Sequence, residues 1–176
     1  MIKTTVIGTP IGDIKAGATK EGLCFLAFND SIKVDSELAE LAGILNTEVT
    51  RGSNRHLRAL KRQLREYFKG KRKDFSLSLV TPGSDFQMQV WNGLKEIPYG
   101  STISYHRQAE KLNNPGAIRA VAHANGSNRI AIIIPCHRVI GADGNLTGYG
   151  GGLERKQWLI DHEKKFSGKP VDGTLF

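Results

Sequence analysis

The chain has 176 residues, of which 39% are hydrophobic and 24% are charged, and its formal net charge is +8. Such a chain can bury a good core as one domain or two small ones, which excludes a largely disordered protein. No apolar run approaches the roughly 20 residues that span a bilayer, and no signal peptide follows Met1. We therefore expect a protein that does not associate with a membrane. We expect it in the cytoplasm, and on the nucleoid or in the nucleus depending on the organism. The positive charge favours a polyanionic partner.

The N-terminal half of the sequence predicts a sheet with helices. Hydrophobic residues alternate in two stretches, which predicts strands of an antiparallel sheet, over residues 4–18 and 22–28. Two helical patterns and one further strand are expected over residues 36–45, 54–69 and 75–80. The turn Thr81-Pro82-Gly83 then separates this half from the next. We expect a scaffold domain over residues 1–81 and a second domain over residues 82–176.

The two cysteines, Cys24 and Cys136, lie in different settings. Cys24 belongs to the apolar run 22–28, so we expect a buried core residue rather than a disulfide partner. Cysteines and histidines do not cluster at ligand spacing, so the sequence predicts no metal site.

Positive charge is concentrated in residues 51–73, which contain ten Lys or Arg and a single acid, Glu66. Apolar residues recur there at helical spacing: Leu57, Leu60, Leu64 and Phe68. The same periodicity places a basic stripe on another face of the helix: Arg58, Arg62, Arg65 and Lys69. This stripe either contacts phosphates or is a solvated face without a ligand, and the sequence leaves both interpretations open.

The second half begins with a well-marked helix. Ser84 with Gln87 three residues later forms a capping box, and an apolar stripe runs toward Pro98: Phe86, Val90, Trp91 and Leu94. Two short helices are then expected over residues 105–112 and 115–125, with Asn114 as the cap of the second and Pro115 at its first position. Their tight connection predicts a helix-turn-helix, although on spacing alone an ordinary antiparallel helix pair is equally compatible.

The composition of the second short helix favours DNA binding in the minor groove. Small residues surround Arg119, and they let a backbone approach closely: Ala117, Ala120, Ala122 and Ala124. Reading bases in the major groove would instead require long polar side chains. We therefore expect binding that does not depend on sequence.

The stretch 132–141 carries the strongest chemical signal. Three isoleucines predict the end of a buried strand, and Pro135 ends its pairing, so Cys136 is placed at the start of a rigid turn. A cysteine reacts as its thiolate, and the adjacent His137 and Arg138 are positive groups that would lower the thiol pKa. The alternative is an inert cysteine that follows a core strand.

The motif Pro135-Cys136-His137-Arg138, with flanking Ile134 and Val139, resembles the active-site signature of the O6-alkylguanine-DNA alkyltransferases. The resemblance extends to residues 81–105, 116–128 and 148–163, whereas the N-terminal half is similar only in general character. It implies an α/β (α+β) fold, with a small N-terminal sheet-plus-helices domain before a mostly helical domain that contains a winged helix-turn-helix-like DNA-binding unit.

The family resemblance also implies an activity. The alkyl group of O6-alkylguanine in double-stranded DNA, and of O4-alkylthymine as well, would pass to Cys136 without a cofactor. The resulting thioether is not hydrolysed, so each protein would act once. We expect a monomer and leave open cooperativity on DNA, alkyl-size preference and a regulatory role.

The roles of individual residues follow from the same resemblance. His137 would be the base for Cys136, acting through a water, and Glu163 would orient His137. Asn128 would brace the turn before Cys136, and Tyr105 would rotate the phosphate and bond the guanine.

The resemblance implies two further sets of contacts. Arg119 would fill the space of the everted nucleotide, and the DNA contacts would be Arg119, Tyr105, Ala117, Ala120, Ala122 and Arg138. The substrate pocket would be lined by Tyr149, Gly150, Val139 and Trp91. The chain departs from common family residues at Ile118, Arg129 and Gly150.

Three other functions are alternatives to alkyl transfer. A cysteine hydrolase would need an oxyanion hole and an acyl-substrate groove, for which the sequence gives no signature. A non-catalytic lesion-binding relative would lack Cys136, and a DNA-binding regulator of this family would need an additional domain.

Overall fold

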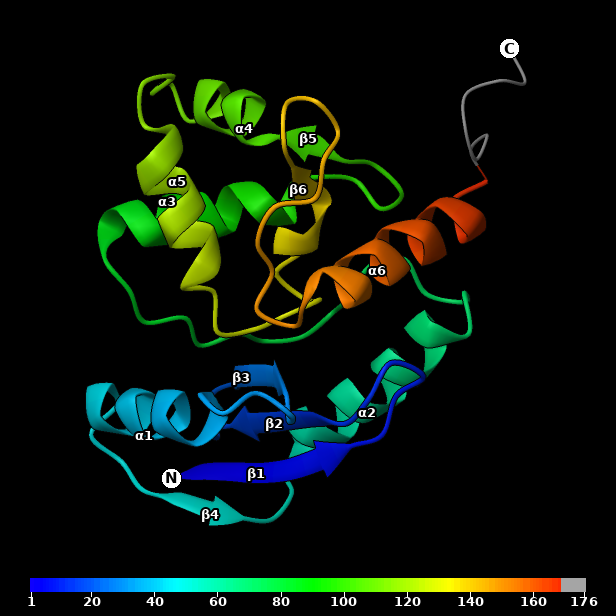
Figure 1. The fold of residues 1–176 in the computed structure, drawn as a ribbon. Helices are drawn as coiled ribbons and strands as arrows, with labels where there is room; N and C mark the ends of the chain where they lie inside the picture. Colours follow the sequence, from blue (N-terminus) through cyan, green and yellow to red (C-terminus); the bar gives the residue numbers. More distant parts are fainter. Residues whose placement is uncertain (169–176) are drawn as a thin grey trace. The chain divides into compact units, whose positions relative to one another are not determined.

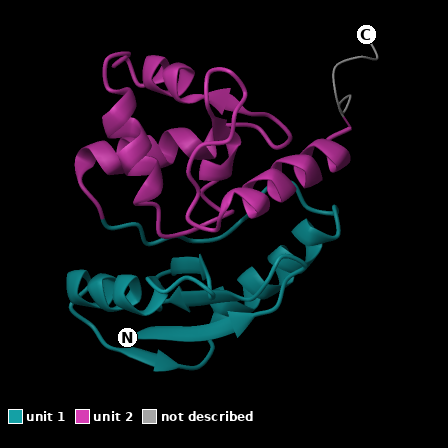
Figure 2. Ribbon diagram, in the orientation of Figure 1, with its two compact units in different colours: residues 1–82 teal, residues 83–176 magenta. Residues whose placement is uncertain are grey.

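The computed structural model describes residues 1–168, and the chain forms two compact units, Met1–Pro82 and Gly83–Phe176 (Figure 2). The boundary lies within the turn at residues 81–83. The mixed architecture of a small sheet unit and a mostly helical unit is the expected fold class (Figure 1).

The sheet of the first unit has the strand order β3-β2-β1-β4. Its strands are β1 (Ile2–Ile7), β2 (Ile14–Ala18), β3 (Leu23–Phe28) and β4 (Val49–Arg51). The expected antiparallel pairing is confirmed for β1 with β2 and β2 with β3, but β4 pairs parallel to β1 and makes the sheet mixed. The sequence did not predict β4, because three residues are too short to show an alternating pattern.

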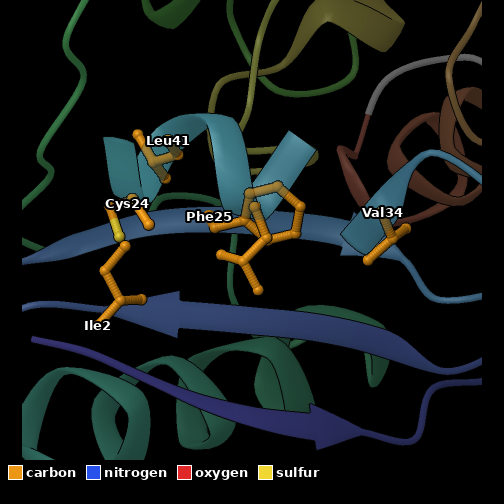
Figure 3. Packing of buried hydrophobic residues seen from close by; sticks show 7 residues of the cluster. Ile2, Cys24, Phe25, Val34 and Leu41 are labelled. Carbon is orange, nitrogen blue, oxygen red and sulfur yellow. The ribbon is translucent and has the colours of Figure 1, made fainter. Parts of the chain in front are cut away.

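Helix α1 (Val34–Ile44) packs on β3 and closes a compact core. Val34 and Leu41 of α1 meet Ile2, Cys24 and Phe25 of the strands (Figure 3). The Cys24 side chain is fully buried, which raises the pKa of its thiol to about 11. The expectation that Cys24 is a core residue is confirmed.

Helix α2 (Arg55–Phe68) packs against β2. Asn54 caps the helix, since its side-chain oxygen accepts from the Leu57 N–H at 3.0 Å while its amide donates to the carbonyls of Ala18 and Thr19. The cap therefore ties the start of α2 to the end of β2. Leu57, Leu60 and Leu64 are buried as expected, and Phe68 is half-buried.

The strand expected over residues 75–80 is wrong, because only Leu79 bridges, to Leu23 of β3. A side chain takes the place of a strand partner at Ser76. Gln63 of α2 accepts from the Ser76 N–H at 2.9 Å and donates to its carbonyl at 3.1 Å. The backbone N–H and carbonyl of Ser76 thus bond to a side chain of α2 and not to a neighbouring strand. The apolar periodicity of a sequence does not show such bonds.

The second unit contains α3 (Asp85–Lys95), β5 (Ile103–Ser104), α4 (Tyr105–Lys111), α5 (Ile118–Gly126), the 3-10 turn η1 (Cys136–Arg138), β6 (Val139–Ile140) and α6 (Leu153–Phe166). The capping box of Ser84 and Gln87 is present, and Ser104 caps α4. Strands β5 and β6 pair in parallel, which joins the start of α4 to the residues after Cys136.

Helix α5 begins three residues later than expected. Asn114 to Ala117 form a turn closed by a 3.0 Å bond from the Ala117 N–H to the Asn114 carbonyl, and Asn113 adopts a φ of 57°. Asn114 is therefore not the cap of α5, and Pro115 lies in the connection rather than in the helix. The turn uses the fixed φ of proline between the two helices.

Two buried polar contacts fix α5 to its neighbours. Gln108 of α4 and Asn125 of α5 exchange two amide hydrogen bonds of 2.8 Å each. Trp91 of α3 donates from Nε1 to the Ala124 carbonyl at 2.9 Å. Both contacts provide hydrogen-bond partners for buried polar groups that would otherwise be costly to bury. They therefore fix the position of α5 against α3 and α4.

The expected strand before Cys136 is also wrong. Ile132, Ile133 and Ile134 form a buried turn, closed by a 3.1 Å bond from the Ile134 N–H to the Ile130 carbonyl. Ile132 has a φ of 69°, a conformation that β-branched residues rarely adopt. The isoleucines therefore bury their side chains by packing a turn, which an apolar run does not distinguish from a strand.

Candidate active site

Cys136 is the first residue of η1 and is partly exposed. Its thiol accepts from the Asn128 side-chain amide at 3.4 Å, and the same amide donates to the Ile134 carbonyl at 2.9 Å. The Asn128 oxygen accepts in turn from the Ile130 N–H. Asn128 thus ties the turn of residues 130–134 to the sulfur.

Burial raises the pKa of the Cys136 thiol above its ordinary value. The hydrogen bond from Asn128 and the positive charge of Lys156 oppose this effect without cancelling it. His137 and Arg138, which were expected to lower the pKa, are not among the groups that do so. Burial therefore favours the protonated thiol over the reactive thiolate.

A buried ionic cluster lies directly behind the cysteine. His137 Nε2 lies 2.8 Å from Glu163 Oε2, and Arg138 donates from Nε to Oε1 at 2.8 Å and from Nη2 to Oε2 at 3.1 Å. Arg138 also donates from Nη1 to the Ile97 carbonyl at 2.7 Å. Because α6 packs against η1, it brings Glu163 to residues that are 25 and 26 positions away in sequence.

The carboxylate of this cluster stays ionised. Burial alone would raise the pKa of Glu163, but the His137 hydrogen bond and the Arg138 guanidinium lower it well below its ordinary range. An ionised carboxylate only accepts, so His137 Nε2 carries the proton of that hydrogen bond. His137 Nδ1 is buried and has no hydrogen-bond partner within residues 1–168. In the neutral imidazole this atom is the one that accepts a proton.

The structure disagrees with the prediction made for Arg138. It was expected to contact DNA, but its side chain is buried and its guanidinium is bound to Glu163 and Ile97. The sequence showed its charge but not its partner, because that partner is on the distant helix α6.

Lys156 is a site residue that the sequence analysis missed. It is fully buried, and its Nζ donates to the carbonyls of Thr147 at 3.0 Å and Gly148 at 3.2 Å. The Tyr105 hydroxyl donates to the same Thr147 carbonyl at 3.1 Å, and Lys156 Nζ lies 5.8 Å from the centroid of the Tyr105 ring. These contacts hold the loop after β6 against α4 and α6. The signal in the sequence was a lysine three and four positions before Leu159 and Ile160, which places it on the same side of the helix as these apolar residues.

The expected pocket residues are divided between this loop and the core. The Tyr149 hydroxyl is buried, and burial, together with the proximity of Cys136 and Glu163, raises its pKa well above the ordinary value. Gly150 is exposed and Val139 is buried in β6. Trp91 is engaged in the packing of α3 on α5, which corrects its assignment to the pocket.

The exposed side of α5 has the expected small residues. Arg119 and Ala120 are exposed, whereas Ala117 and Ala122 are partly exposed. Ile118, one of the departures from the family pattern, is 37% exposed. The exposed side of α5 therefore consists mainly of small side chains, among which Arg119 is the long one.

Within residues 1–168, no three His, Cys, Asp or Glu side chains come together as metal ligands. None of the helices described is both long enough and apolar enough to cross a membrane.

Comparison with known proteins identifies the family of this site. A profile described as "6-O-methylguanine DNA methyltransferase, DNA binding domain" matches residues 85–165, and one described as "6-O-methylguanine DNA methyltransferase, ribonuclease-like domain" matches residues 2–81. The chain belongs to the 6-O-methylguanine DNA methyltransferase family. The profile matches lie on either side of the turn at residues 81–83.

Individual relatives agree with this family. A methylated-DNA--protein-cysteine methyltransferase of Methanosarcina acetivorans is 44% identical over 161 residues, which are 90% of this chain and 96% of that protein. One from Mycobacterium tuberculosis is 55% identical over 114 residues, 65% of this chain and 68% of that protein. The crystal structure of M. tuberculosis O6-methylguanine methyltransferase has a TM-score of 0.80 and 41% identity, and covers 100% of this chain and 99% of its own. That of M. tuberculosis OGT in complex with DNA has a TM-score of 0.79 and 40% identity over 92% of each chain.

Proposed function

We propose that this methyltransferase-family protein repairs DNA by moving the alkyl group of O6-alkylguanine irreversibly onto the sulfur of Cys136. The observation that carries the proposal is the position of Cys136 beside a buried histidine whose Nε2 is held by Glu163 and whose Nδ1 is free to accept a proton. In the reaction a bond forms between sulfur and the alkyl carbon, and the bond from that carbon to guanine O6 breaks. The electron pair leaves with guanine, which takes up a proton.

His137 is the group that removes the thiol proton. Because the pKa of the Cys136 thiol is raised by burial, the free thiolate is scarce and general-base help is needed. Nδ1 accepts that proton through a water, since adjacent residues seldom reach each other with good geometry. The imidazolium that forms is stabilised by Glu163, which remains ionised throughout.

Tyr105 and Lys156 act on the substrate side. Tyr105 is bound to the Thr147 carbonyl here, and it exchanges this partner for the nucleotide when DNA enters. Lys156 keeps its hold on the loop and supplies positive charge to the developing thiolate. Tyr149 forms a wall of the pocket, and backbone N–H groups near Gly150 receive guanine O6.

Duplex DNA is bound through α4 and α5, with α5 in the minor groove. Arg119 enters the stack in place of the everted nucleotide, where its planar guanidinium stacks on the neighbouring bases. The small residues of α5 allow the close approach that this requires. O4-alkylthymine is a second substrate, and the protein acts in the compartment that holds the chromosome.

Each molecule reacts once, because water does not hydrolyse a thioether at a useful rate. The alkyl group also adds volume beside a packed turn, which we expect to destabilise the spent protein by about 1–3 kcal/mol. The same chemistry needs no cofactor.

The test compares two cysteine variants on a duplex that contains O6-methylguanine. Cys136→Ser should abolish methyl transfer, whereas Cys24→Ser, a change in the core of the other unit, should retain it. Transfer measured with a radiolabelled methyl group decides between them. A Cys136→Ser protein that still removed the methyl group would disprove the proposal.

A further inference from the structure

The first unit carries a basic face that the proposed reaction does not use. Four side chains of α2 lie at helical spacing and are all exposed: Arg58, Arg62, Arg65 and Lys69. The opposite side of α2 is buried through Leu57, Leu60, Leu64 and Tyr67. The helix is therefore anchored by its apolar side, and the basic face (Arg58, Arg62, Arg65 and Lys69) is free to meet a partner.

The charges of this unit are strongly segregated. Residues 51–73 carry ten Lys or Arg against one acid, whereas the rest of residues 1–82 carries four basic and eight acidic side chains. A merely soluble surface does not require such a separation, since mixed charges serve solubility equally well. The segregation instead creates a local positive field that attracts a polyanion.

Intramolecular ion pairs leave most of the basic face unneutralised. Glu66 is engaged mainly by Arg72, at 3.2 Å, and lies 3.7 Å from Arg62. Within the described residues, Arg58, Arg65 and Lys69 have no carboxylate within 4.0 Å. These three charges can therefore pair with an external anion without first breaking a salt bridge.

The spacing of the basic face fits a nucleic-acid backbone. Lys69 follows Arg58 by eleven positions, which corresponds to about 16 Å of helix at a rise of 1.5 Å per residue. One strand of duplex DNA presents a phosphate about every 3.4 Å along its axis, so this length matches roughly five phosphates. The chemistry is sequence-independent, because charged side chains on one helix face address phosphates and not base edges.

We propose that the basic face of α2 is a second contact surface for the phosphate backbone of duplex DNA, in addition to α4 and α5. The choice of duplex DNA as the partner rests on the proposed function. Phosphate contacts outside the helix-turn-helix would raise affinity for undamaged DNA and would let the protein search along it. They would leave the chemistry at Cys136 unchanged.

The experiment measures binding to an undamaged duplex over a salt series. The test variant carries Gln in place of all four residues of the basic face, which removes charge while keeping helix propensity. A control variant with the same loss of net charge carries Gln at four exposed lysines elsewhere: Lys20, Lys33, Lys95 and Lys165. Two half variants, Arg58→Gln with Arg62→Gln and Arg65→Gln with Lys69→Gln, keep the comparison interpretable if the four-fold variant folds poorly.

If all four residues contact phosphates, log K should fall less steeply with log salt in the test variant than in the wild type. The magnitude of the slope should be smaller by about 3.6, from roughly 0.9 per contact. Between 50 and 200 mM salt the wild type would then lose about 150-fold more affinity than the test variant, and each half variant should show about half the change in slope. The control variant should keep the wild-type slope. Equal slopes for the test and control variants would overturn the proposal.

A second readout separates this proposal from the proposed function. Alkyl transfer from a free O6-alkylguanine base to Cys136 should be unchanged in the four-fold variant, because the base meets only the second unit. Failure of transfer in the wild type would contradict the repair function, while the contrast in salt slopes would still decide whether the basic face binds DNA.

Discussion

Replacing Glu163 by Gln should destabilise the second unit strongly. The carboxylate receives hydrogen bonds from His137 and Arg138, and the side chains of Arg138 and Glu163 are only 8% and 2% exposed. A neutral amide would leave the Arg138 charge buried without compensation and would point a donor at other donors. Breaking a buried pair in this way costs about 3–5 kcal/mol, a large part of the roughly 5–15 kcal/mol that stabilises a typical domain.

Urea unfolding followed by tryptophan fluorescence measures this loss in the correct unit, because both tryptophans, Trp91 and Trp158, belong to residues 83–176. Asp161→Asn is the matched control, since Asp161 is an exposed acid in the same helix. The control should change the free energy of unfolding by about 0.5 kcal/mol or less. Adding Arg138→Met to Glu163→Gln should recover part of the loss, because the uncompensated charge is then removed.

The pH dependence of this stabilisation has a definite direction. The pKa of Glu163 is lower in the folded protein than in the unfolded chain, so its contribution is complete above the ordinary carboxyl pKa of about 4.3. It is lost as the pH falls below that value through the folded-state pKa. The wild type and Glu163→Gln should therefore converge only in acid. If Glu163→Gln lost no more stability than Asp161→Asn at neutral pH, the Glu163 carboxylate would not be compensating the buried charge of Arg138.

Three further predictions concern the site and its support. Lys156→Met should shift the reaction of Cys136 with iodoacetamide to higher pH, because a charge that lowers the thiol pKa is removed; an unchanged pH profile would contradict this role. Arg119→Ala should slow transfer from duplex DNA by about tenfold or more while sparing the free base, since base extrusion costs a few kcal/mol; equal losses would assign Arg119 to folding or chemistry. Gln108→Leu and Asn125→Leu should each cost about 1–3 kcal/mol by leaving a buried amide unpaired, and the double variant should cost less than their sum in a urea double-mutant cycle.

Local signals predicted most of the fold. Helix α2 was recognised from its 3.6-residue periodicity, and α3 from a capping box that the structure contains. Two predicted strands were wrong, because an apolar run does not show whether its backbone pairs with a strand, closes a turn or bonds a side chain. The apolar run before Cys136 forms a buried turn, and in residues 75–80 Ser76 pairs with the Gln63 side chain of a helix while only Leu79 bridges to a strand.

The site shows the same division. The motif around Cys136 and the family resemblance indicated His137 and Glu163, which the structure brings to 2.8 Å. Arg138 was assigned to DNA because its sequence neighbours do not reveal that α6 returns to neutralise it. Lys156 was missed for a related reason, because its partners are backbone carbonyls. Every residue has such a carbonyl, so the sequence does not show which of them a lysine will bind.

Transfer of the methyl group to Cys136 is tested most simply by measuring the mass of the protein after it is mixed with an excess of duplex containing O6-methylguanine. We expect each molecule to gain one methyl group on Cys136, as located by peptide mapping, and we expect no further lesion to be repaired once the protein is consumed. A methyl group on Cys24, repeated turnover, or an unmodified protein with intact lesions would contradict it.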